Sequence, residues 1–215
     1  MKAFLLATLA AAGLTLSGPA ACARIDAEPS VEESADANDF RAETPLREIA
    51  EAADRILLVR ILDAGADAFA AQVLDAYAGN AIAGERIRIA YGRYNEFDPR
   101  WAAYAEEQTV VVFLEADDDS SAPYRILGEN GEGEFPVEDG TVFIVGHFID
   151  GLPVERHALK GGGLAGHAAP LEELAGALRD FSACRSGCDK LCRETRVDAR
   201  ENLSPLRRAL FGDQS

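Results

Sequence analysis

The strongest constraint on the fold of this chain is a succession of short apolar runs with the spacing of β-strands. In the third run, Arg86 and Arg88 alternate with Ile87 and Ile89, and this period of two gives a strand one solvated and one buried face. The first and fourth runs are more continuously apolar. Strands are therefore expected at residues 55–63, 69–77, 85–91, 109–115, 124–128, 135–137 and 141–148.

Turn and capping residues indicate how these strands are connected. Asp139-Gly140 favours a tight hairpin, because both central positions of such a turn need a positive φ. Thr44 and Pro45 form a hydroxyl cap and a first-turn proline, so a short amphipathic helix should precede the sheet. Another helix is expected at residues 98–105. Strand, strand, strand, helix, strand, strand is the order of a five-stranded Greek-key barrel of the OB type, and we expect a mainly β domain with flanking helices.

The barrel region resembles bacterial exported domains that are similar to the netrin-like barrel, which the tissue inhibitors of metalloproteinases share. The resemblance covers roughly residues 44–148 and lies in the runs Ala53-Asp54-Arg55-Ile56-Leu57-Leu58-Val59, Val73-Leu74-Asp75-Ala76-Tyr77-Ala78-Gly79, Gly84-Glu85-Arg86-Ile87, Val111-Val112-Phe113-Leu114 and Gly133-Glu134-Phe135-Pro136-Val137-Glu138-Asp139-Gly140. In those inhibitors a free N-terminal cysteine on the barrel chelates the protease zinc. Here Cys22 lies more than thirty residues before the first strand, so metalloproteinase inhibition is not expected.

The N-terminus has the three parts of a bacterial export signal: Lys2, the apolar run Ala3 to Leu16, and small residues up to Ala23. The apolar run is too short to span ~30 Å of hydrocarbon. Cleavage before Cys22 would expose a cysteine for lipidation, and cleavage after Ala23 would remove that cysteine. The mature protein is therefore expected in the cell envelope, lipid-anchored and facing the periplasm, or else secreted or periplasmic.

Composition sets the remaining boundaries. Residues 22–43 are acidic and poor in apolar groups, as in a disordered tether. Removing the signal peptide (residues 1–21) takes one lysine and no acidic residue, which changes the formal charge from −16 to −17. Such a chain is a poor partner for nucleic acid or anionic lipid, so contact with a membrane is expected through the lipid anchor alone. The barrel domain should occupy residues 44–168. A helical tail should occupy residues 169–215, and Pro170 opens its first helical run.

Three cysteines, Cys184, Cys188 and Cys192, recur at intervals of four residues in this tail and would share one face of a helix. Three cysteines cannot all pair within one chain, so one disulfide with one free or intermolecular thiol is one interpretation. Zinc or copper binding with His147, His157 or His167 as a fourth ligand is another, and redox chemistry is a third. His157 and His167 flank Gly161-Gly162-Gly163 in a segment that is expected to be a loop. Met1 is the only methionine, which disfavours copper.

The sequence contains no nucleophile elbow, phosphate-binding loop or paired-histidine spacing, so a non-catalytic function is expected. The acidic segment 129–134 could bind calcium, although its glycines suit a turn. The aromatic residues Tyr94, Phe97, Trp101 and Tyr104 gather between the third and fourth strands, either as packing for one end of the barrel or as a recognition surface for a glycan or peptide. The expected function is an envelope binding or assembly module that contacts an envelope protein or glycan; the alternative is a thiol-based metal or redox protein.

Overall fold

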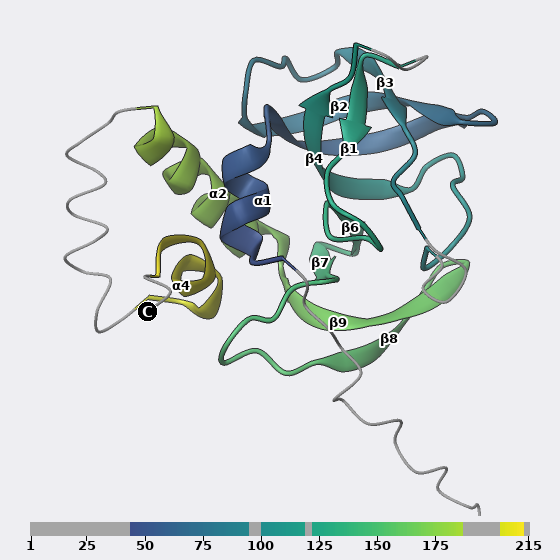
Figure 1. The fold of residues 1–215 in the computed structure, drawn as a ribbon. Helices are drawn as coiled ribbons and strands as arrows, with labels where there is room; N and C mark the ends of the chain where they lie inside the picture. Colours follow the sequence, from purple (N-terminus) through teal and green to yellow (C-terminus); the bar gives the residue numbers. More distant parts are fainter. Residues whose placement is uncertain (1–43, 95–99, 119–121, 187–202, 213–215) are drawn as a thin grey trace, which may run out of the picture. The chain divides into compact units, whose positions relative to one another are not determined.

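The computed structural model describes residues 44–94, 100–118, 122–186 and 203–212 (Figure 1). The first described element is helix α1 (Leu46–Ala52). The described strands are β1 (Arg55–Ala64), β2 (Ala68–Ala78), β3 (Arg86–Ala90), β4 (Thr109–Ala116), β5 (Tyr124–Ile126), β6 (Glu134–Glu138), β7 (Thr141–Ile144), β8 (Glu155–Leu159) and β9 (Gly162–Pro170). Helices α2 (Leu171–Arg185) and α4 (Pro205–Phe211) follow the strands.

Five of the strands form a closed barrel in the order β1-β2-β3-β5-β4, and pairing between β1 and β4 closes it. The neighbours β3 and β5 are parallel, with Ile89 opposite Tyr124, and the other neighbouring strands of the barrel are antiparallel. This is the expected mainly β fold with an OB-type five-stranded barrel and a helical C-terminal part, and the expectation is confirmed.

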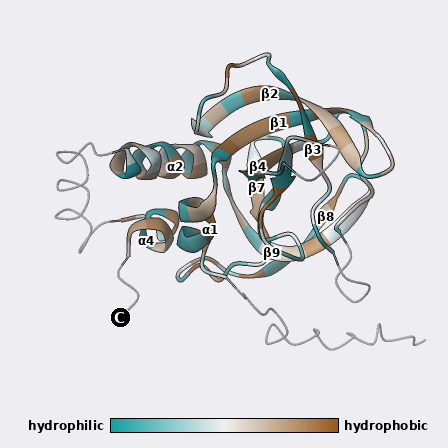
Figure 2. Ribbon diagram, turned by 45° about the horizontal axis from the view of Figure 1, so that its top comes forward, coloured by the Kyte–Doolittle hydropathy of each residue, from teal (hydrophilic) through white to brown (hydrophobic). Residues whose placement is uncertain are grey.

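Residues 56–59 of β1 form a continuous apolar run because both faces of the strand are covered there. Leu57, Val59 and Ile61 point into the barrel, where they pack with residues of β2, β3 and β4. Ile56 belongs to a second core, which lies between the sheet and the helices and includes Leu178 of α2 and Leu206 of α4. Figure 2 shows the corresponding apolar stretch along β1 and the three helices grouped on one side of the barrel.

The sheet continues beyond the barrel through β6, β7, β9 and β8. The hairpin that joins β6 to β7 has Asp139 at φ 48° and Gly140 at φ 77°, so the predicted Asp-Gly turn is confirmed. The short helix before the sheet is also confirmed, but Pro45 occupies its N-cap position and Thr44 does not cap it. The Thr44 hydroxyl instead donates to Glu132 Oε2 at 3.3 Å.

The hairpin of β8 and β9 corrects the interpretation of His157 and His167 as loop residues, because each lies on a strand. The glycine triplet between them suggested a loop, but its glycines serve the hairpin. Gly161 adopts φ 92° in the turn. A Cβ on Gly162 would lie 1.7 Å from the carbonyl oxygen of Trp101, so only glycine lets these two segments approach.

The helix expected at residues 98–105 is absent from its described part, residues 100–105. The side chain of Gln108 takes the place of helical hydrogen bonds there. Its Nε2 donates to the Ala103 carbonyl at 2.8 Å, and its Oε1 accepts from the Ala105 N–H at 3.3 Å. A polar side chain that bonds nearby backbone groups competes with helix formation, and here the competing structure prevails.

The expected signal peptide, cleavage site and tether lie outside the described residues, as do Phe97, Cys188 and Cys192. None of the helices in the described part of the chain has the length and apolar character needed to cross a membrane.

Candidate functional site

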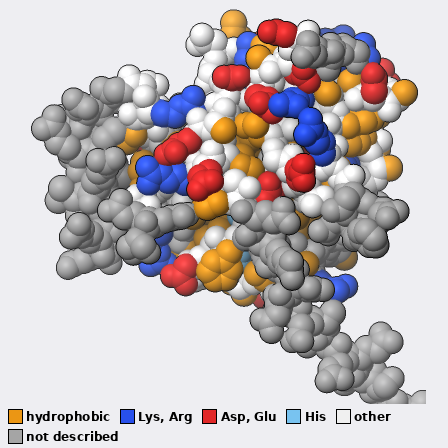
Figure 3. Space-filling view, in the orientation of Figure 1, with side chains coloured by type: hydrophobic (Ala, Val, Ile, Leu, Met, Phe, Trp, Pro, Cys, Tyr) orange, Lys and Arg blue, Asp and Glu red, His pale blue; other side chains and the backbone are white. Residues whose placement is uncertain are grey.

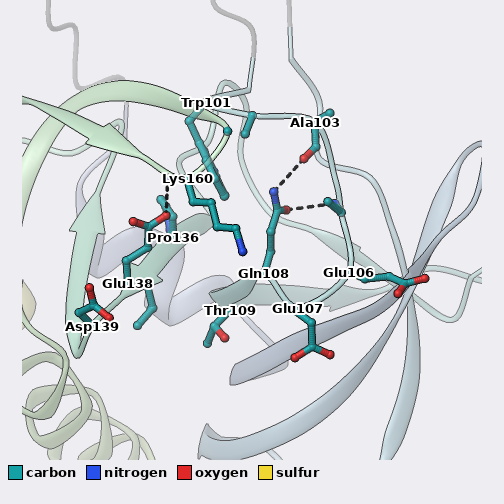
Figure 4. A pocket seen from close by; sticks show the side chains of 14 residues that line it. Trp101, Ala103, Glu106, Glu107, Gln108, Thr109, Pro136, Glu138, Asp139 and Lys160 are labelled. Carbon is teal, nitrogen blue, oxygen red and sulfur yellow. Dashed lines mark hydrogen bonds between the residues drawn. The ribbon is translucent and has the colours of Figure 1, made fainter. Parts of the chain in front are cut away.

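A pocket of about 510 Å³ lies where the segment 101–108 meets the β6–β7 turn and the β8–β9 turn (Figure 4). Its lining combines backbone and side chains from all three places. The residues that line it are Trp101, Ala102, Ala103, Ala105, Glu106, Glu107, Gln108, Thr109, Pro136, Val137, Glu138, Asp139, Lys160 and Gly161. The volume lies in the range of pockets that bind small molecules.

The pocket has an apolar wall and a charged rim. Trp101, Ala102, Pro136 and Val137 provide an apolar surface. The charged lining residues are Glu106, Glu107, Glu138, Asp139 and Lys160, so carboxylates outnumber ammonium groups four to one. Figure 4 shows the Lys160 side chain reaching into the middle of the pocket below Trp101.

Behind the Trp101 wall lies a buried carboxylate, Glu134, whose exposed fraction is 0 %. Its Oε1 accepts from Arg100 Nε at 3.0 Å, and Arg100 Nη2 donates to the same oxygen. Its Oε2 accepts from the hydroxyls of Tyr94 at 2.9 Å and Tyr104 at 2.8 Å. Every oxygen of this carboxylate is therefore hydrogen-bonded, which is the condition for burying a charge without a large penalty.

The Arg100 guanidinium joins this carboxylate to the pocket wall. It lies 4.3 Å from the centre of the Trp101 ring and 3.7 Å from that of Tyr104, within cation–π range. It also donates to Gln108 Oε1 at 3.2 Å and to the Ala102 carbonyl. The buried pair thus holds Trp101, Tyr104 and Gln108 in fixed positions, and it pre-organises one wall of the pocket.

The electrostatic effects of this network follow from burial and from Glu134. Burial acts to lower the pKa of Arg100, but the Glu134 carboxylate outweighs it, and the pKa lies above its usual value. Burial, followed by the Glu134 charge, raises the pKa values of Tyr94 and Tyr104 well above 10. Arg100 therefore stays charged and both hydroxyls stay protonated as donors.

The structure separates the four aromatic residues that the sequence grouped. Tyr94 and Tyr104 are donors to Glu134, and Tyr104 also stacks on Tyr91, with 4.1 Å between the ring centres. Trp101 lines the pocket. Tyr94 and Tyr104 therefore pack inside the domain, and the recognition surface for a glycan or peptide stays a prediction. Phe97 lies outside the described residues.

Sequence reasoning missed Arg100 and Glu134. Glu134 belonged to an acidic segment that was interpreted as a turn with an alternative role in calcium binding. Two carboxylates of this acidic segment point inward, since Glu132 is 6 % exposed and Glu134 is 0 % exposed. Two signals were available: Glu134 stands at the start of an apolar strand, and Arg100 is embedded among aromatic residues of the sequence.

A second buried polar group ties the start of α1 to the segment before β6. His147 is 0 % exposed, and its Nδ1 lies 2.7 Å from the Thr44 carbonyl oxygen and its Nε2 2.6 Å from the Glu132 carbonyl oxygen. Burial lowers the pKa of His147, and the two carbonyls and the Glu132 charge oppose this shift. A neutral imidazole has one N–H, so the ring donates to one of these carbonyls and lies in contact with the other.

The other histidines also have backbone partners. His167 Nδ1 donates to the Pro153 carbonyl at 2.9 Å, and its Nε2 accepts from the Ile149 N–H at 3.1 Å. His157 Nε2 lies 3.2 Å from the Gly166 carbonyl oxygen. Within the described ranges, no three His, Cys, Asp or Glu side chains are placed to hold a metal ion.

The cysteine group is described at one of its three positions. Cys184 lies in the last turn of α2 and is not a free thiol. Cys188 and Cys192 fall outside the described residues, so the disulfide, metal and redox interpretations stay predictions.

Comparisons of the chain with models of protein families, with curated proteins and with solved structures find no significant match. The fold and the pocket are therefore the basis for the functional argument.

Proposed function

We propose that this protein is an exported, non-catalytic binding module of the cell envelope, anchored through lipid on Cys22, with the Trp101 pocket as its binding site. The export signal and the cysteine at its end support the location, and the acidic tether gives the domain reach from a membrane surface. The resemblance to netrin-like domains agrees with an OB-type barrel, and inhibition of metalloproteinases is not part of the proposal.

The observation that carries the proposal is a pocket whose wall is held by a buried ion pair. Burying Arg100 and Glu134 costs desolvation energy that a purely apolar core would avoid. The pair fixes Trp101 and Gln108, both of which line the pocket. Pre-organised walls reduce the entropy that is lost when a ligand binds, so this arrangement suits binding.

The anchor is tested by intact mass spectrometry of the protein purified from its native envelope. A diacyl or triacyl increment on a chain that begins at Cys22 supports lipid anchoring. A chain that begins at Arg24 without lipid contradicts the anchor and leaves a periplasmic or secreted module.

The pocket is tested by placing a photo-crosslinking amino acid at Ala103, an exposed residue of the pocket lining, in cells that carry the native envelope. Ile82 is a matched control position, because it is 78 % exposed and does not line the pocket. We expect a discrete adduct from position 103 that is absent from position 82. Adducts of the same size from both positions, or from neither, would contradict a binding site in the pocket.

Replacing all three tail cysteines with serine separates this proposal from a thiol function. Cys184 is placed at the end of α2, whereas the pocket lies among the 101–108 segment and the two hairpin turns. A binding module keeps its adduct from position 103 in the triple variant. Loss of that adduct from a variant that is still folded would favour the thiol-based alternative.

A further inference from the structure

We propose that the pocket takes the cationic side chain of a basic polypeptide segment, and that Lys160 occupies the pocket as an internal competitor until the segment binds. The inference rests on the proposed function and specifies its ligand. It is carried by the charges of the lining, the apolar wall and the position of the Lys160 side chain.

The charges of the lining favour a cation. Glu106, Glu107 and Asp139 are exposed, and Glu138 is half-buried. Glu107 forms an ion pair with Arg60, with 3.7 Å between Oε2 and Nη1. The Glu107 side chain is 71 % exposed, so this ion pair is weak. Glu138 Oε1 accepts from the backbone N–H of Lys160 at 2.7 Å. The pocket therefore presents a surplus of negative charge to any ligand.

The apolar wall fits the aliphatic stem and planar head of a long basic side chain. Trp101, Ala102 and Pro136 provide contact for methylene groups. Trp101 already stacks with the guanidinium of Arg100, which shows that its ring environment accepts a guanidinium. The indole Nε1–H of Trp101 is buried and has no acceptor among the described residues. A polypeptide brings carbonyl acceptors as well as a cation, and a simple amine does not.

Lys160 explains how the pocket stays stable without its ligand. It lies in the β8–β9 turn, is exposed, and its ammonium has no ion pair among the described residues. Its flexible stem reaches the middle of the pocket (Figure 4), where it offsets part of the negative charge. An incoming cation would displace it to solvent at little cost, because the lysine is tethered only through its own backbone.

The whole chain supports a basic partner. The formal charge is −17 after removal of the signal peptide, and a field of this sign speeds the approach of positively charged segments. Figure 3 shows acidic and basic side chains interspersed over the visible face, so the pocket is distinguished by its local surplus of carboxylates.

The test uses the fluorescence of Trp101, which is the only tryptophan of the chain and lies in the pocket wall. The mature protein is titrated with an acetylated and amidated peptide that carries three arginines, and with the same peptide carrying citrulline, the neutral isostere. Spermidine is the third probe. We expect a saturable change of fluorescence with the arginine peptide, and a change at least tenfold weaker in affinity with the other two.

Two variants assign the binding to the lining. Glu106→Gln with Asp139→Asn removes two carboxylates and keeps the turn, since asparagine tolerates the positive φ at position 139. This double variant should bind the arginine peptide with an affinity about fivefold lower than that of the wild type. Glu48→Gln with Glu172→Gln is the matched control, because it removes two exposed carboxylates outside the pocket and should change the affinity less than twofold.

The Lys160→Gln variant has the sharpest outcome, because its sign depends on the ligand. A cationic ligand binds about threefold more tightly once the competitor is gone. An anionic ligand would bind more weakly, and weaker binding in this variant overturns the proposal. Equal binding of the arginine and citrulline peptides overturns it as well, and equal binding of spermidine overturns its polypeptide part.

The failure of this inference is distinguishable from that of the proposed function. A missing response to the arginine peptide, together with a discrete adduct from position 103 in the envelope, means that the pocket binds a ligand of another class. A missing response together with no adduct removes the binding site itself.

Discussion

At the scale of single residues, the structure buries the Arg100–Glu134 ion pair where each member has several partners. Glu134 accepts four hydrogen bonds, which come from Arg100, Tyr94 and Tyr104. The Arg100 side chain is 7 % exposed, so neither member of the pair can regain water if the other is removed. The loss of one partner should therefore cost more than the pair contributes as a whole.

A double-mutant cycle tests this coupling. Glu134→Gln and Arg100→Met should each lower the free energy of unfolding by about 3 kcal/mol, because each leaves one buried charge unpaired. The double variant should lose much less than the sum of the two. The measurement is urea unfolding followed by Trp101 fluorescence and by circular dichroism. The exposed pair Arg47 and Glu51 is the control, and Glu51→Gln should change stability by less than about 0.5 kcal/mol. Additive losses at positions 100 and 134 would show that they act independently.

His147 gives a prediction at acidic pH. Burial lowers its pKa, so the folded protein holds this ring neutral while the unfolded chain binds a proton near pH 6.5. Its contribution to stability is therefore present above pH 6.5 and is lost as the pH falls through the lower, folded-state pKa. Unfolding free energies measured between pH 7.5 and pH 5 should fall for the wild type and fall less for His147→Phe. Equal slopes for both proteins would show that another group controls the acid side.

At the scale of secondary-structure elements, the sequence predicted what local patterns encode. Alternation in Arg86–Ala90 and the Asp139-Gly140 turn located β3 and the β6–β7 hairpin. The β8–β9 hairpin was missed because β9 begins with glycines whose purpose, the close approach to Trp101, depends on a segment about sixty residues earlier. The Arg100–Glu134 pair was missed for the same reason, since its members are 34 positions apart and meet only through β4 and β6 pairing.

Two glycine-to-alanine variants test this account, because one should lower the free energy of unfolding and the other should raise it. Gly162→Ala would place a Cβ 1.7 Å from the Trp101 carbonyl oxygen, so the hairpin must move away from the pocket wall. We expect it to destabilise the protein by more than about 2 kcal/mol and to shift the Trp101 emission. Gly176→Ala lies inside α2, where the nearest atom to the new Cβ is the Arg207 side chain at 3.7 Å.

The Gly176→Ala variant should raise the free energy of unfolding by about 0.5–1 kcal/mol, because alanine favours a helix interior over glycine. Both variants are compared by thermal and urea unfolding. Destabilisation by both would indicate that α2 packs more tightly at Gly176 than the distance suggests. Neutral behaviour of Gly162→Ala would indicate that the hairpin is free to move, and it would weaken the argument for a fixed pocket wall.

At the scale of the whole molecule, each of the two cores contains or contacts a buried tyrosine, and the ionisation of these tyrosines can be followed as the pH rises. Tyr77 belongs to the core beneath the helices and is 4 % exposed, while Tyr104 packs against the barrel core. Burial, then the Asp75 charge, raises the pKa of Tyr77 to about 12, although Arg179 acts to lower it. The pKa values of Tyr94 and Tyr104 are raised by burial and by Glu134. Tyr124, a half-buried residue of β5, provides an internal comparison in the same chain.

These raised pKa values predict that the protein loses stability at alkaline pH, and that the tyrosines ionise when the protein unfolds. A tyrosine whose folded-state pKa is raised contributes stability that is fully present below pH 10, the value of an unshifted tyrosine, and is lost as the pH rises through the folded-state pKa. The free energy of unfolding should therefore decline between pH 10 and pH 12, and absorbance of tyrosinate should appear together with the loss of circular dichroism. Tyr77→Phe should make this decline shallower, whereas Tyr124→Phe should leave it unchanged. If tyrosinate formed gradually in a protein that kept its circular dichroism, the tyrosines would be accessible in the folded state, and the two cores would be less closed than their packing indicates.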